Sequence, residues 1–332
     1  MPPQPVARVY RGTPRNLARL ARRLQAGELV AVPTETVYGL AANAFDAAAC
    51  RKIFAAKGRP ASDPLIVHIH GLRDLAAVAE TNAAAAKLAA KFWPGPLTLV
   101  LRKNPAVPAV VSAGLSSVAV RMPAHPLFRR LLRLAGLPLA APSANPFGYV
   151  SPTTAEHVRE SLGKRIRHIL DGGAAQIGLE STIVDLRNPR KPRLLRPGAV
   201  THAALERALG VKVARSRRAA QFEKLAVAQV APGLLARHYS PRAAVVLHRK
   251  IDATRPLAAD EAWVFLGRPA GRRGGNVFSL DPRGDLRGVA RRLFATLRQC
   301  DDGRFKKIHV ELAPGAGLAD AVNDRLRRAA AR

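Results

Sequence analysis

Apolar residues recur along this chain at two spacings, and the alternation between them predicts a mixed fold. Short apolar runs are typical of buried strands, whereas apolar residues repeated every three or four positions are typical of amphipathic helices. The apolar runs predict strands over residues 29–32, 65–69, 97–101, 118–121, 137–141, 169–170, 182–186 and 194–195. The helical repeats predict a helix between Thr13 and Gly27 and others over 47–56, 72–79, 82–92, 126–134, 153–162 and 201–209. Because strands and helices do not alternate regularly, the pattern favours an open mixed sheet.

The C-terminal part of the chain repeats this pattern on a smaller scale. Strands are predicted over 245–247, 263–266, 277–279 and 308–312, with helices over 285–299 and 318–331. Residues 212–242 interrupt the rhythm with a basic run and the segment A-P-G-L-L-A-R-H-Y-S-P, which is typical of a linker. The sequence therefore predicts an α/β (α+β mixed) open twisted sheet with helices in 1–211, a linker in 212–242 and a small Rossmann-like α/β domain in 243–332.

The charge balance is strongly positive. Lys and Arg number 54 against 23 Asp and Glu in 332 residues, which gives a formal net charge of +31. Such an excess attracts polyanions such as nucleotide phosphates, RNA or acidic partners. Part of it accompanies a composition rich in Ala and Arg, so the charge predicts general affinity for polyanions rather than a dedicated RNA-binding function.

Cysteine content and hydropathy limit the class of protein. Cys50 and Cys300 are the only cysteines, so a zinc cluster and a disulfide framework are both excluded, and we expect reduced thiols in a cytoplasmic protein. The N-terminus lacks the apolar core of a signal peptide. The longest uncharged stretch, residues 134–155, contains Pro138, Pro142 and Pro146 and cannot form a membrane helix. We therefore expect a soluble protein with no membrane partner.

Two cations stand at the end of a predicted helix, in the segment K-G-R-P-A-S-D-P-L-I-V-H-I. Gly58 and Pro60 break the helix, so Lys57 and Arg59 leave it on a turn. The strand that follows carries His68 as its ionisable residue. Paired cations beside a polar group on a core strand suit an anion bound across a sheet edge. The alternative is a solvated helix end.

A second candidate segment is the loop P-S-A-N-P-F-G-Y-V-S-P-T over residues 142–153. Small hydroxyls and an amide held between prolines are costly to order unless something binds them. The chain has no G-x-x-x-x-G-K-S/T phosphate loop and no Ser-His-Asp or metal-binding cluster. The loop is therefore a candidate binding segment outside the common phosphate-binding motifs.

A series of motifs occurs in order along the first three quarters of the chain: P-T-E-T-V-Y-G-L, K-G-R-P-A-S-D-P-L, W-P-G-P-L-T-L-V, V-A-V-R-M-P, A-P-S-A-N, S-P-T, G-L-E-S-T-I-V-D-L, L-R-P-G and R-H-Y-S-P. With the tail G-L-A-D-A-V-N-D-R-L-R-R-A, they resemble the long, two-domain threonylcarbamoyl-AMP synthases, which join a YrdC-like catalytic domain to a C-terminal α/β domain. The resemblance implies a nucleotidyltransferase that condenses L-threonine, bicarbonate and ATP into L-threonylcarbamoyladenylate and pyrophosphate. A separate threonylcarbamoyl transferase complex would then modify an adenosine beside the anticodon of tRNA.

The resemblance also assigns residues to the substrates. Lys57 and Arg59 would bind the phosphates of ATP and act in catalysis. Arg121, at the end of a strand, would hold the threonine carboxylate in a bidentate contact that lysine would not replace. The other positions that match threonine contacts are Thr36, His68, Ala141 and Ser181. The other positions that match ATP contacts are Asp63, Ser117, Ser143, Asn145, Ser151, Arg196 and Tyr239.

Some of these positions depart from the family pattern or stay open. Asp63 stands where an amide is usual, and since a carboxylate would repel phosphate, we expect it to face Mg²⁺, Arg59 or solvent. Ser117 replaces an expected threonine and keeps the hydroxyl. Glu35 is either a cap or a carboxylate beside the metal. Tyr239 lies in the linker, and the resemblance implies that R-H-Y-S-P closes over the site as a lid, because a carbamate–phosphate anhydride hydrolyses readily.

Two other functions compete with the synthase. The net charge also fits a non-catalytic module that binds double-stranded RNA or the ribosome. A carbamoyl-transfer domain of the hydrogenase-maturation type shares the YrdC-like fold, but such proteins carry cysteine-rich zinc modules that this chain lacks. A basic surface is compatible with the synthase, since it could help to pass the adenylate to a tRNA-bound partner.

Overall fold

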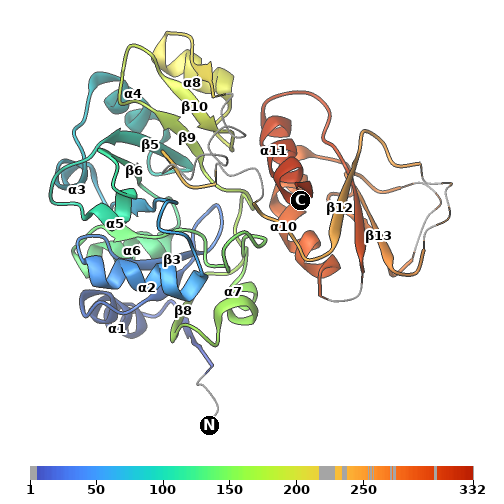
Figure 1. Ribbon diagram of the computed structural model, residues 1–332, viewed down its shortest axis with the longest axis horizontal. Coiled ribbons are helices and arrows are strands. Elements are labelled where there is room, and N and C mark those ends of the chain that lie inside the picture. Colours follow the sequence, from blue (N-terminus) through green and yellow to red (C-terminus); the bar gives the residue numbers. More distant parts are fainter. Residues whose placement is uncertain are drawn as a thin grey trace.

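A computed structural model describes residues 6–216, 229–233 and 238–331, apart from 253, 255, 257, 270, 272–273 and 303–304. Among these residues the strands form a larger sheet and a smaller one, each with its own helices (Figure 1). The predicted mixed α/β fold with a second, smaller α/β unit is thereby confirmed. The predicted linker 212–242 falls partly on residues 217–228 and 234–237, which lie outside the described residues. The domain boundaries remain our proposal.

The larger sheet takes its strands from distant parts of the chain. Its order is β1-β8-β2-β3-β7-β4-β6-β5-β9-β10-β11. The strands are β1 (Arg8–Arg11), β2 (Val30–Val32), β3 (Gly39–Asn43), β4 (Ile66–His68), β5 (Leu97–Arg102), β6 (Ser117–Arg121), β7 (Leu139–Ala140), β8 (His168–Asp171), β9 (Thr182–Asp185), β10 (Arg193–Arg196) and β11 (Ala214–Arg215). The helices are α1 (Pro14–Gln25), α2 (Ala47–Lys57), α3 (Leu72–Val78), α4 (Ala83–Phe92), α5 (Ala109–Ser112), α6 (Pro126–Ala135), α7 (Ala155–Leu162) and α8 (His202–Leu209).

Sequence patterns missed three strands of this sheet: the two-residue β11, which falls in the predicted linker, and the longer β1 and β3. Strand β1 reads R-V-Y-R, with charged residues at both ends, and it forms by parallel pairing with β8. Strand β3 reads G-L-A-A-N, and its small residues have little strand propensity of their own. It forms because it pairs with β2 on one side and β7 on the other. Both strands depend on partners that are distant in sequence.

Local signals fix the start and the end of the helix that leads to the candidate anion site. The Asp46 side chain caps α2 by accepting hydrogen bonds from Ala48 N (2.8 Å) and Ala49 N (3.0 Å). Gly58 ends the helix with φ +62°, a left-handed conformation that favours glycine. Lys57 and Arg59 are buried, with 2% and 7% of their surfaces exposed. The alternative of a solvated helix end is therefore wrong.

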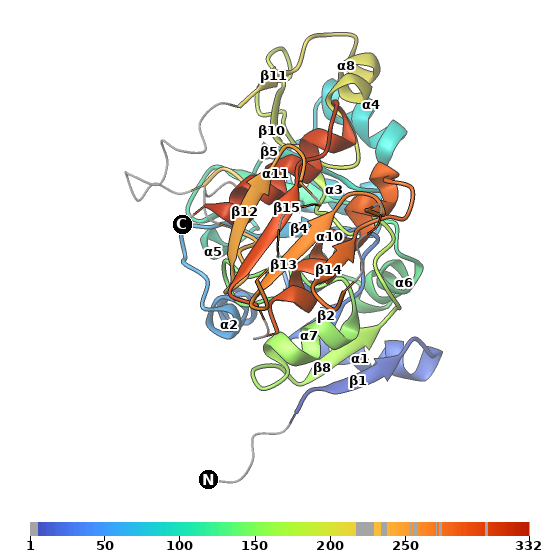
Figure 2. The ribbon, with the colours of Figure 1, turned by 90° about the vertical axis from the view of Figure 1, so that its right-hand side faces the viewer.

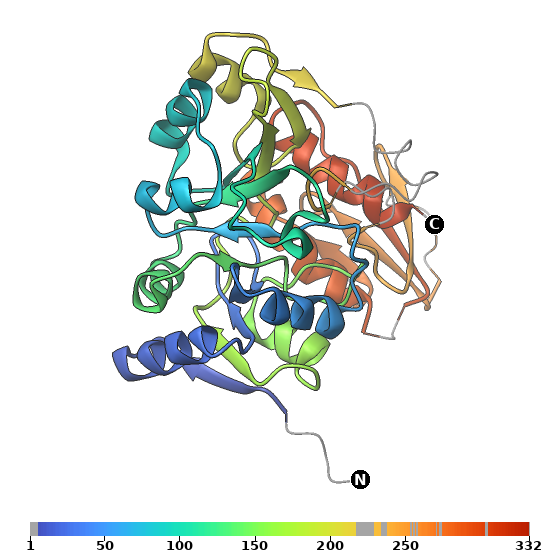
Figure 3. The ribbon, with the colours of Figure 1, turned by 60° about the vertical axis from the view of Figure 1, so that its left-hand side comes forward.

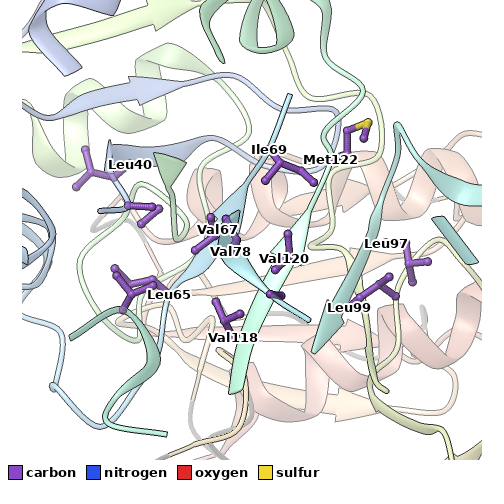
Figure 4. Packing of buried hydrophobic residues seen from close by; sticks show 14 of the residues in the cluster. Leu40, Leu65, Val67, Ile69, Val78, Leu97, Leu99, Val118, Val120 and Met122 are labelled. Carbon is purple, nitrogen blue, oxygen red and sulfur yellow. The ribbon is translucent and has the colours of Figure 1, made fainter. Parts of the chain in front are cut away.

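The two faces of the larger sheet are covered differently. On one face, apolar side chains of β4, β5 and β6 such as Val67, Leu99 and Val120 pack in a core with α2, α3, α4, α5, α7 and α8 (Figure 4). On the other face, α1 and α6 cover the β1-β8-β2-β3-β7 end through residues such as Leu17 and Phe128. Among the described residues, no helix of this sheet contributes to the small apolar cluster over the β4-β6-β5-β9 end. The candidate site lies there.

The smaller sheet is parallel, and its helices face the larger domain. Its order is β12-β15-β13-β14, and all neighbouring pairs are parallel. The elements are β12 (Ala244–His248), β13 (Glu261–Phe265), β14 (Val277–Ser279), β15 (Lys307–Glu311), α10 (Leu286–Cys300) and α11 (Leu318–Ala330). Helices α10 and α11 lie between this sheet and the larger domain (Figures 1 and 2).

Helix α10 docks on two segments that border the candidate site. Arg298 donates hydrogen bonds to Val150 O (2.6 Å) and Ser161 Oγ (2.9 Å) of the larger domain. Burial lowers the pKa of Arg298 to about 10, so it stays protonated at neutral pH. Gly178 approaches the helix so closely that a Cβ there would lie 2.5 Å from Arg291 Cα. In the described part of the chain, the helices are too short or too polar to cross a membrane.

Replacing Gly178 by alanine should weaken the docking of α10. Gly178 has φ +78° and Gly114 has φ +79°, but only Gly178 has atoms within 4 Å of the added Cβ. Both alanine variants should be destabilised by about 1–2 kcal/mol for the left-handed backbone. Gly178→Ala should be destabilised by roughly 1–3 kcal/mol more for the overlap with α10. Urea unfolding of the two variants measures the difference, and equal destabilisation would show that the close approach does not matter.

Candidate active site

Strand register places three polar side chains in one row across the uncovered end of the larger sheet. His68 of β4 lies opposite Arg121 of β6, and Arg121 lies opposite Thr98 of β5. Because alternate residues of a strand face the same side, this row shares its face with Ile66, Ala119 and Val100 rather than with the apolar core behind. A narrow pocket of about 40 Å³ lies over the row. That volume is too small for a nucleotide, so a large ligand could bind only if the cover of the pocket moved.

Most of the residues that were predicted from the sequence to contact threonine or ATP line this pocket. The residues predicted to contact threonine all line it, namely Thr36, His68, Arg121, Ala141 and Ser181. Of those predicted to contact ATP, the lining includes Arg59, Ser143, Arg196 and Tyr239. Lys57, Asp63, Ser117, Asn145 and Ser151 are buried nearby but do not line the pocket. The roles assigned to all of these residues remain predictions.

Arg121 is held from three sides and keeps part of its guanidinium free. Its Nη2 lies 2.7 Å from Glu35 Oε1, its Nη1 donates to Thr36 Oγ1 (2.9 Å) and its Nε donates to Gly95 O (3.2 Å). Burial alone would raise the pKa of Glu35, but the Arg121 charge outweighs it and holds that pKa below its usual range. The guanidinium has five N–H donors, so donors remain for a substrate carboxylate. The pair also settles the open interpretation of Glu35, which binds Arg121.

His68 presents a neutral imidazole beside that guanidinium. Burial first, and the Arg121 charge second, lower the pKa of His68 to about 3. Its Nδ1 has no hydrogen-bond partner among the described residues. Its ring packs 5.4 Å from that of Phe128, centroid to centroid. A buried polar atom without a hydrogen-bond partner is unfavourable. We therefore expect His68 Nδ1 to form a hydrogen bond with a polar ligand.

Arg196 ties together three segments at the opposite wall. It donates from Nε to Ser181 O (3.1 Å), from Nη2 to Ser181 Oγ (3.2 Å) and from Nη1 to Pro232 O (3.2 Å). Ser181 Oγ also lies 2.7 Å from Thr98 Oγ1 of the strand row. A Cβ at Gly233 would lie 2.6 Å from the Tyr239 hydroxyl and 2.8 Å from Arg196 Nη1, so only glycine fits this turn of the linker. Strand, loop and linker therefore meet at one guanidinium.

Three buried cations, Lys57, Arg59 and Arg196, lie near the pocket, and one carboxylate, Asp63, lies among them. Lys57 Nζ donates to the carbonyl oxygens of Ser143 and Asn145. Arg59 donates to Asp63 O (2.9 Å) and lies 2.9 Å from Asp63 Oδ2. Burial is the largest effect on each group, and it lowers the pKa of Lys57 and Arg59 and raises that of Asp63. Of the three orientations expected for Asp63, the structure shows the one toward Arg59. With Arg196, this group favours a polyanion.

The linker covers one side of the pocket through Pro232, Gly233, His238 and Tyr239. Gln229 N donates to Ser62 O (3.0 Å), and Ala231 packs in the apolar cluster on the sheet. Ser117 Oγ and Asn145 Oδ1 are buried and have no hydrogen-bond partner in the described residues. Such buried polar atoms without a partner are suited to binding a polar ligand.

Two ionisable lining residues, His238 and Glu180, were not among the sequence candidates. Burial first, and then the charges of Arg59, Lys57 and other arginines, lower the pKa of His238 well below its usual value. Glu180 Oε1 accepts a hydrogen bond from Ser151 Oγ, and its other oxygen pairs with Arg325 of α11. The signals were present in R-H-Y-S-P and G-L-E-S-T, where each residue adjoins one that was selected. Thr98 could have been predicted as a polar residue of this face, because it lies in the strand predicted over 97–101 and alternate residues of a strand face the same side.

Comparison with known proteins assigns both parts of the chain. A family model for Sua5, YciO and YrdC proteins, described as "Telomere recombination", matches residues 22–198. A second model, described as "Threonylcarbamoyl-AMP synthase, C-terminal domain", matches residues 200–331.

Relatives of similar length match nearly the whole chain. The threonylcarbamoyl-AMP synthase of Pyrococcus abyssi is 42% identical over 320 residues, 92% of this chain and 91% of the relative. The Bacillus subtilis threonylcarbamoyl-AMP synthase is 40% identical over 330 residues, 95% of this chain and 92% of the relative. The crystal structure of P. abyssi Sua5 complexed with L-threonine superimposes with a TM-score of 0.88 at 39% identity, covering 98% and 97% of the two chains. The chain therefore belongs to the threonylcarbamoyl-AMP synthase family of enzymes, in its two-domain form.

Proposed function

We propose that this protein condenses L-threonine, bicarbonate and ATP into L-threonylcarbamoyladenylate and releases pyrophosphate. The observation that carries the proposal is the position of the Arg121 clamp beside the cations Arg59 and Arg196 in one pocket. An amino acid and a polyphosphate can thus bind side by side. The P. abyssi relative that was solved with L-threonine supports the amino-acid half of the proposal.

The threonine subsite is close to neutral overall, which suits a zwitterion. Arg121 and Glu35 compensate each other, and His68 is uncharged. The free donors of Arg121 would bind the carboxylate in a bidentate contact. Thr36, Ser181 and the imidazole of His68 would exchange hydrogen bonds with the amine and the hydroxyl. Ala141 would form the wall against which the side-chain methyl packs.

The chemistry requires two bond-forming steps. The threonine amine, once it has lost its ammonium proton to water, attacks the bicarbonate carbon, and the C–N bond of a carbamate forms as a C–O bond of bicarbonate breaks and water leaves. A carbamate oxygen then attacks the α-phosphorus of ATP, and the bond from that phosphorus to the bridging oxygen breaks to release pyrophosphate. Lys57, Arg59 and Arg196 would neutralise the charge that develops on the leaving pyrophosphate. Catalysis of this kind rests on positioning and electrostatics.

The loop and the linker would complete the nucleotide subsite. Ser117, Ser143, Asn145 and Ser151 offer polar groups to the nucleotide, and Asp63 would keep Arg59 charged and oriented. We propose that the linker opens to admit ATP and that Tyr239 then closes over the nucleotide. Such a closed site excludes water from a carbamate–phosphate anhydride.

The acidic residues around the pocket do not fit a protein-held Mg²⁺. Asp63, Glu35 and Glu180 are engaged by Arg59, Arg121 and Arg325. In the described ranges no group of three His, Cys, Asp or Glu residues could hold a metal. Magnesium commonly binds substrate phosphates and keeps several waters. We therefore propose that Mg²⁺ arrives with the triphosphate. The adenylate would pass in the cytoplasm to a transferase complex that modifies tRNA.

A second candidate function is RNA binding, and a specific surface favours it. Helices α1 and α6 pack side by side, and neither contains an acidic residue. Arg23 is exposed but pairs with Glu28. The other exposed arginines of these helices, here called the arginine face, are Arg15, Arg19, Arg22, Arg130 and Arg133. Figure 3 shows α1 (dark blue) and α6 (green) on the side of the larger domain away from the C-terminal domain. Such a face would attract the phosphates of tRNA or double-stranded RNA and is compatible with the synthase.

Release of pyrophosphate should require ATP, threonine and bicarbonate together, with threonylcarbamoyladenylate detected by mass spectrometry of the quenched mixture. Arg59→Ala should reduce the rate at least about 100-fold, as expected for loss of a group that stabilises transition-state charge. Arg130→Ala, an exposed control, should keep the rate. Failure of well-folded wild-type protein to release pyrophosphate would refute the synthase.

Arg121→Lys should raise the KM for threonine roughly 10–100-fold and leave the KM for ATP nearly unchanged, because a charge-assisted bidentate contact is worth about 1.5–3 kcal/mol. Steady-state kinetics with each substrate varied in turn measure the split. The matched control is Arg133→Lys on the surface of α6. Equal effects on both substrates would contradict a dedicated threonine clamp.

Replacing Arg15, Arg19 and Arg22 together by glutamine should weaken binding of double-stranded RNA. The slope of log affinity against log salt should fall by roughly one unit for each phosphate that the protein no longer neutralises. The control replaces the exposed Arg268, Arg283 and Arg287 of the C-terminal domain, with the same change in net charge. Fluorescence anisotropy over a salt series measures both. Equal weakening in the two variants would show general attraction to a basic protein rather than an arginine face.

A further inference from the structure

We infer that Arg325 of the C-terminal domain is a positioning residue for the nucleotide side of the pocket. The inference rests on the proposed function. Arg325 belongs to the tail motif V-N-D-R-L-R-R-A. Apart from the contact of Arg325 with Glu180, no role in the pocket has been assigned to this motif above. Its Asn323 joins the N–H and C=O of Ala313 through two hydrogen bonds of 2.8 Å, which anchors α11 in its own domain.

Arg325 crosses from α11 into the wall of the pocket. Its side chain is fully buried, and its Nε lies 2.7 Å from Glu180 Oε2. Its guanidinium carbon stands 5.3 Å from the centre of the Tyr239 ring, within the range of a cation–π contact. Both partners line the pocket. One residue of the smaller domain therefore touches two walls of the site in the larger domain and linker.

The contact continues through Glu180 to the binding loop. Glu180 Oε1 accepts the hydrogen bond of Ser151 Oγ, so its carboxylate joins Ser151 to Arg325. Burial alone would lower the pKa of Arg325, but Tyr239, Glu180 and Asp324 raise it, and the group stays charged. Burial and the nearby Glu180 raise the pKa of Tyr239, which stays neutral. At this wall of the pocket, Arg325 therefore carries a positive charge and Tyr239 carries none.

The same helix holds the linker by its backbone. His238 N and Ser240 Oγ both lie 3.3 Å from Arg328 O and donate to it. Between them, Tyr239 has φ +61°, a conformation that is unfavourable for a bulky residue and persists only where its surroundings impose it. The Arg325 contact with the ring and the two contacts with Arg328 O supply that constraint from α11.

The charge of Glu180 explains why loss of Arg325 should weaken the binding of ATP more than the binding of threonine. Without Arg325, the Glu180 carboxylate would face the pocket uncompensated, close to where the triphosphate is proposed to bind, and would repel it. The threonine clamp Arg121 does not depend on this wall, since it pairs with Glu35, and Ser181, which adjoins Glu180, is held by Arg196 rather than by Arg325. Loss of Arg325 should therefore weaken ATP binding and retention of the adenylate, and it should spare threonine binding.

The test compares Arg325→Met and Arg325→Lys in the full-length protein with Arg327→Met, an exposed neighbour on the same helix. Arg325→Met should raise the KM for ATP at least about tenfold and change the KM for threonine less than about twofold, and more adenylate should appear in solution per turnover. Arg325→Lys should recover part of the ATP affinity. Glu180→Gln combined with Arg325→Met should bind ATP better than Arg325→Met alone, because the uncompensated charge is gone. Arg327→Met should match wild type.

Several outcomes would overturn the inference. An unchanged KM for ATP in Arg325→Met would do so, as would equal loss of affinity for both substrates with a lowered unfolding midpoint, which indicates a purely structural contact. Should Arg325→Met fail to fold, Arg325→Lys and the double variant decide by the same criteria. A wild-type protein without synthase activity would refute the proposed function instead. Calorimetric titration with a non-hydrolysable ATP analogue would then still compare Arg325→Met with Arg327→Met.

Discussion

The burial of several cations around a single carboxylate is the constraint on which the rest of this molecule depends. Lys57, Arg59 and Arg196 are nearly inaccessible to water, and Asp63 is the acid placed among them. Burying unbalanced charge is unfavourable, so the protein solvates these groups with backbone carbonyls at the ends of β-strands and loops. A polyphosphate would supply the missing negative charge. The stability of this region and the proposed affinity for ATP would thus be two consequences of one electrostatic imbalance.

The two halves of the pocket differ in charge, and the substrates proposed for them differ in charge in the same way. On the threonine side, Glu35 balances Arg121, and burial keeps His68 neutral. A zwitterion can enter such a site without leaving a net charge behind. On the nucleotide side the imbalance is positive, which suits a triphosphate. The sheet sets this division, since the threonine groups project from the strand row, whereas Lys57 and Arg59 arrive from the end of a helix.

The parts of the site that could be predicted are those written in local sequence. The cap at Asp46 and the break at Gly58 located the cations, and strand periodicity located His68 and Arg121 on short buried strands. What could not be predicted depends on distant pairing. The burial of Lys57 requires carbonyls that lie 86 and 88 residues further along the chain. Single motifs indicate residue chemistry, but the partners of that chemistry follow from the order of strands and the docking of domains.

The proposed function creates a conflict between access and protection, and contacts of the second domain bear on it. ATP would have to enter a site that must afterwards exclude water from its product. A free linker would lose conformational entropy each time it closed. Here Arg328 O of α11 accepts hydrogen bonds from His238 N and Ser240 Oγ, one on each side of Tyr239, and these contacts would help to offset that entropy cost. The left-handed backbone of Tyr239 acts in the opposite direction, because its strain lowers the free energy needed to leave this arrangement. In the proposed cycle, closure would thereby be favoured by the helix and remain reversible.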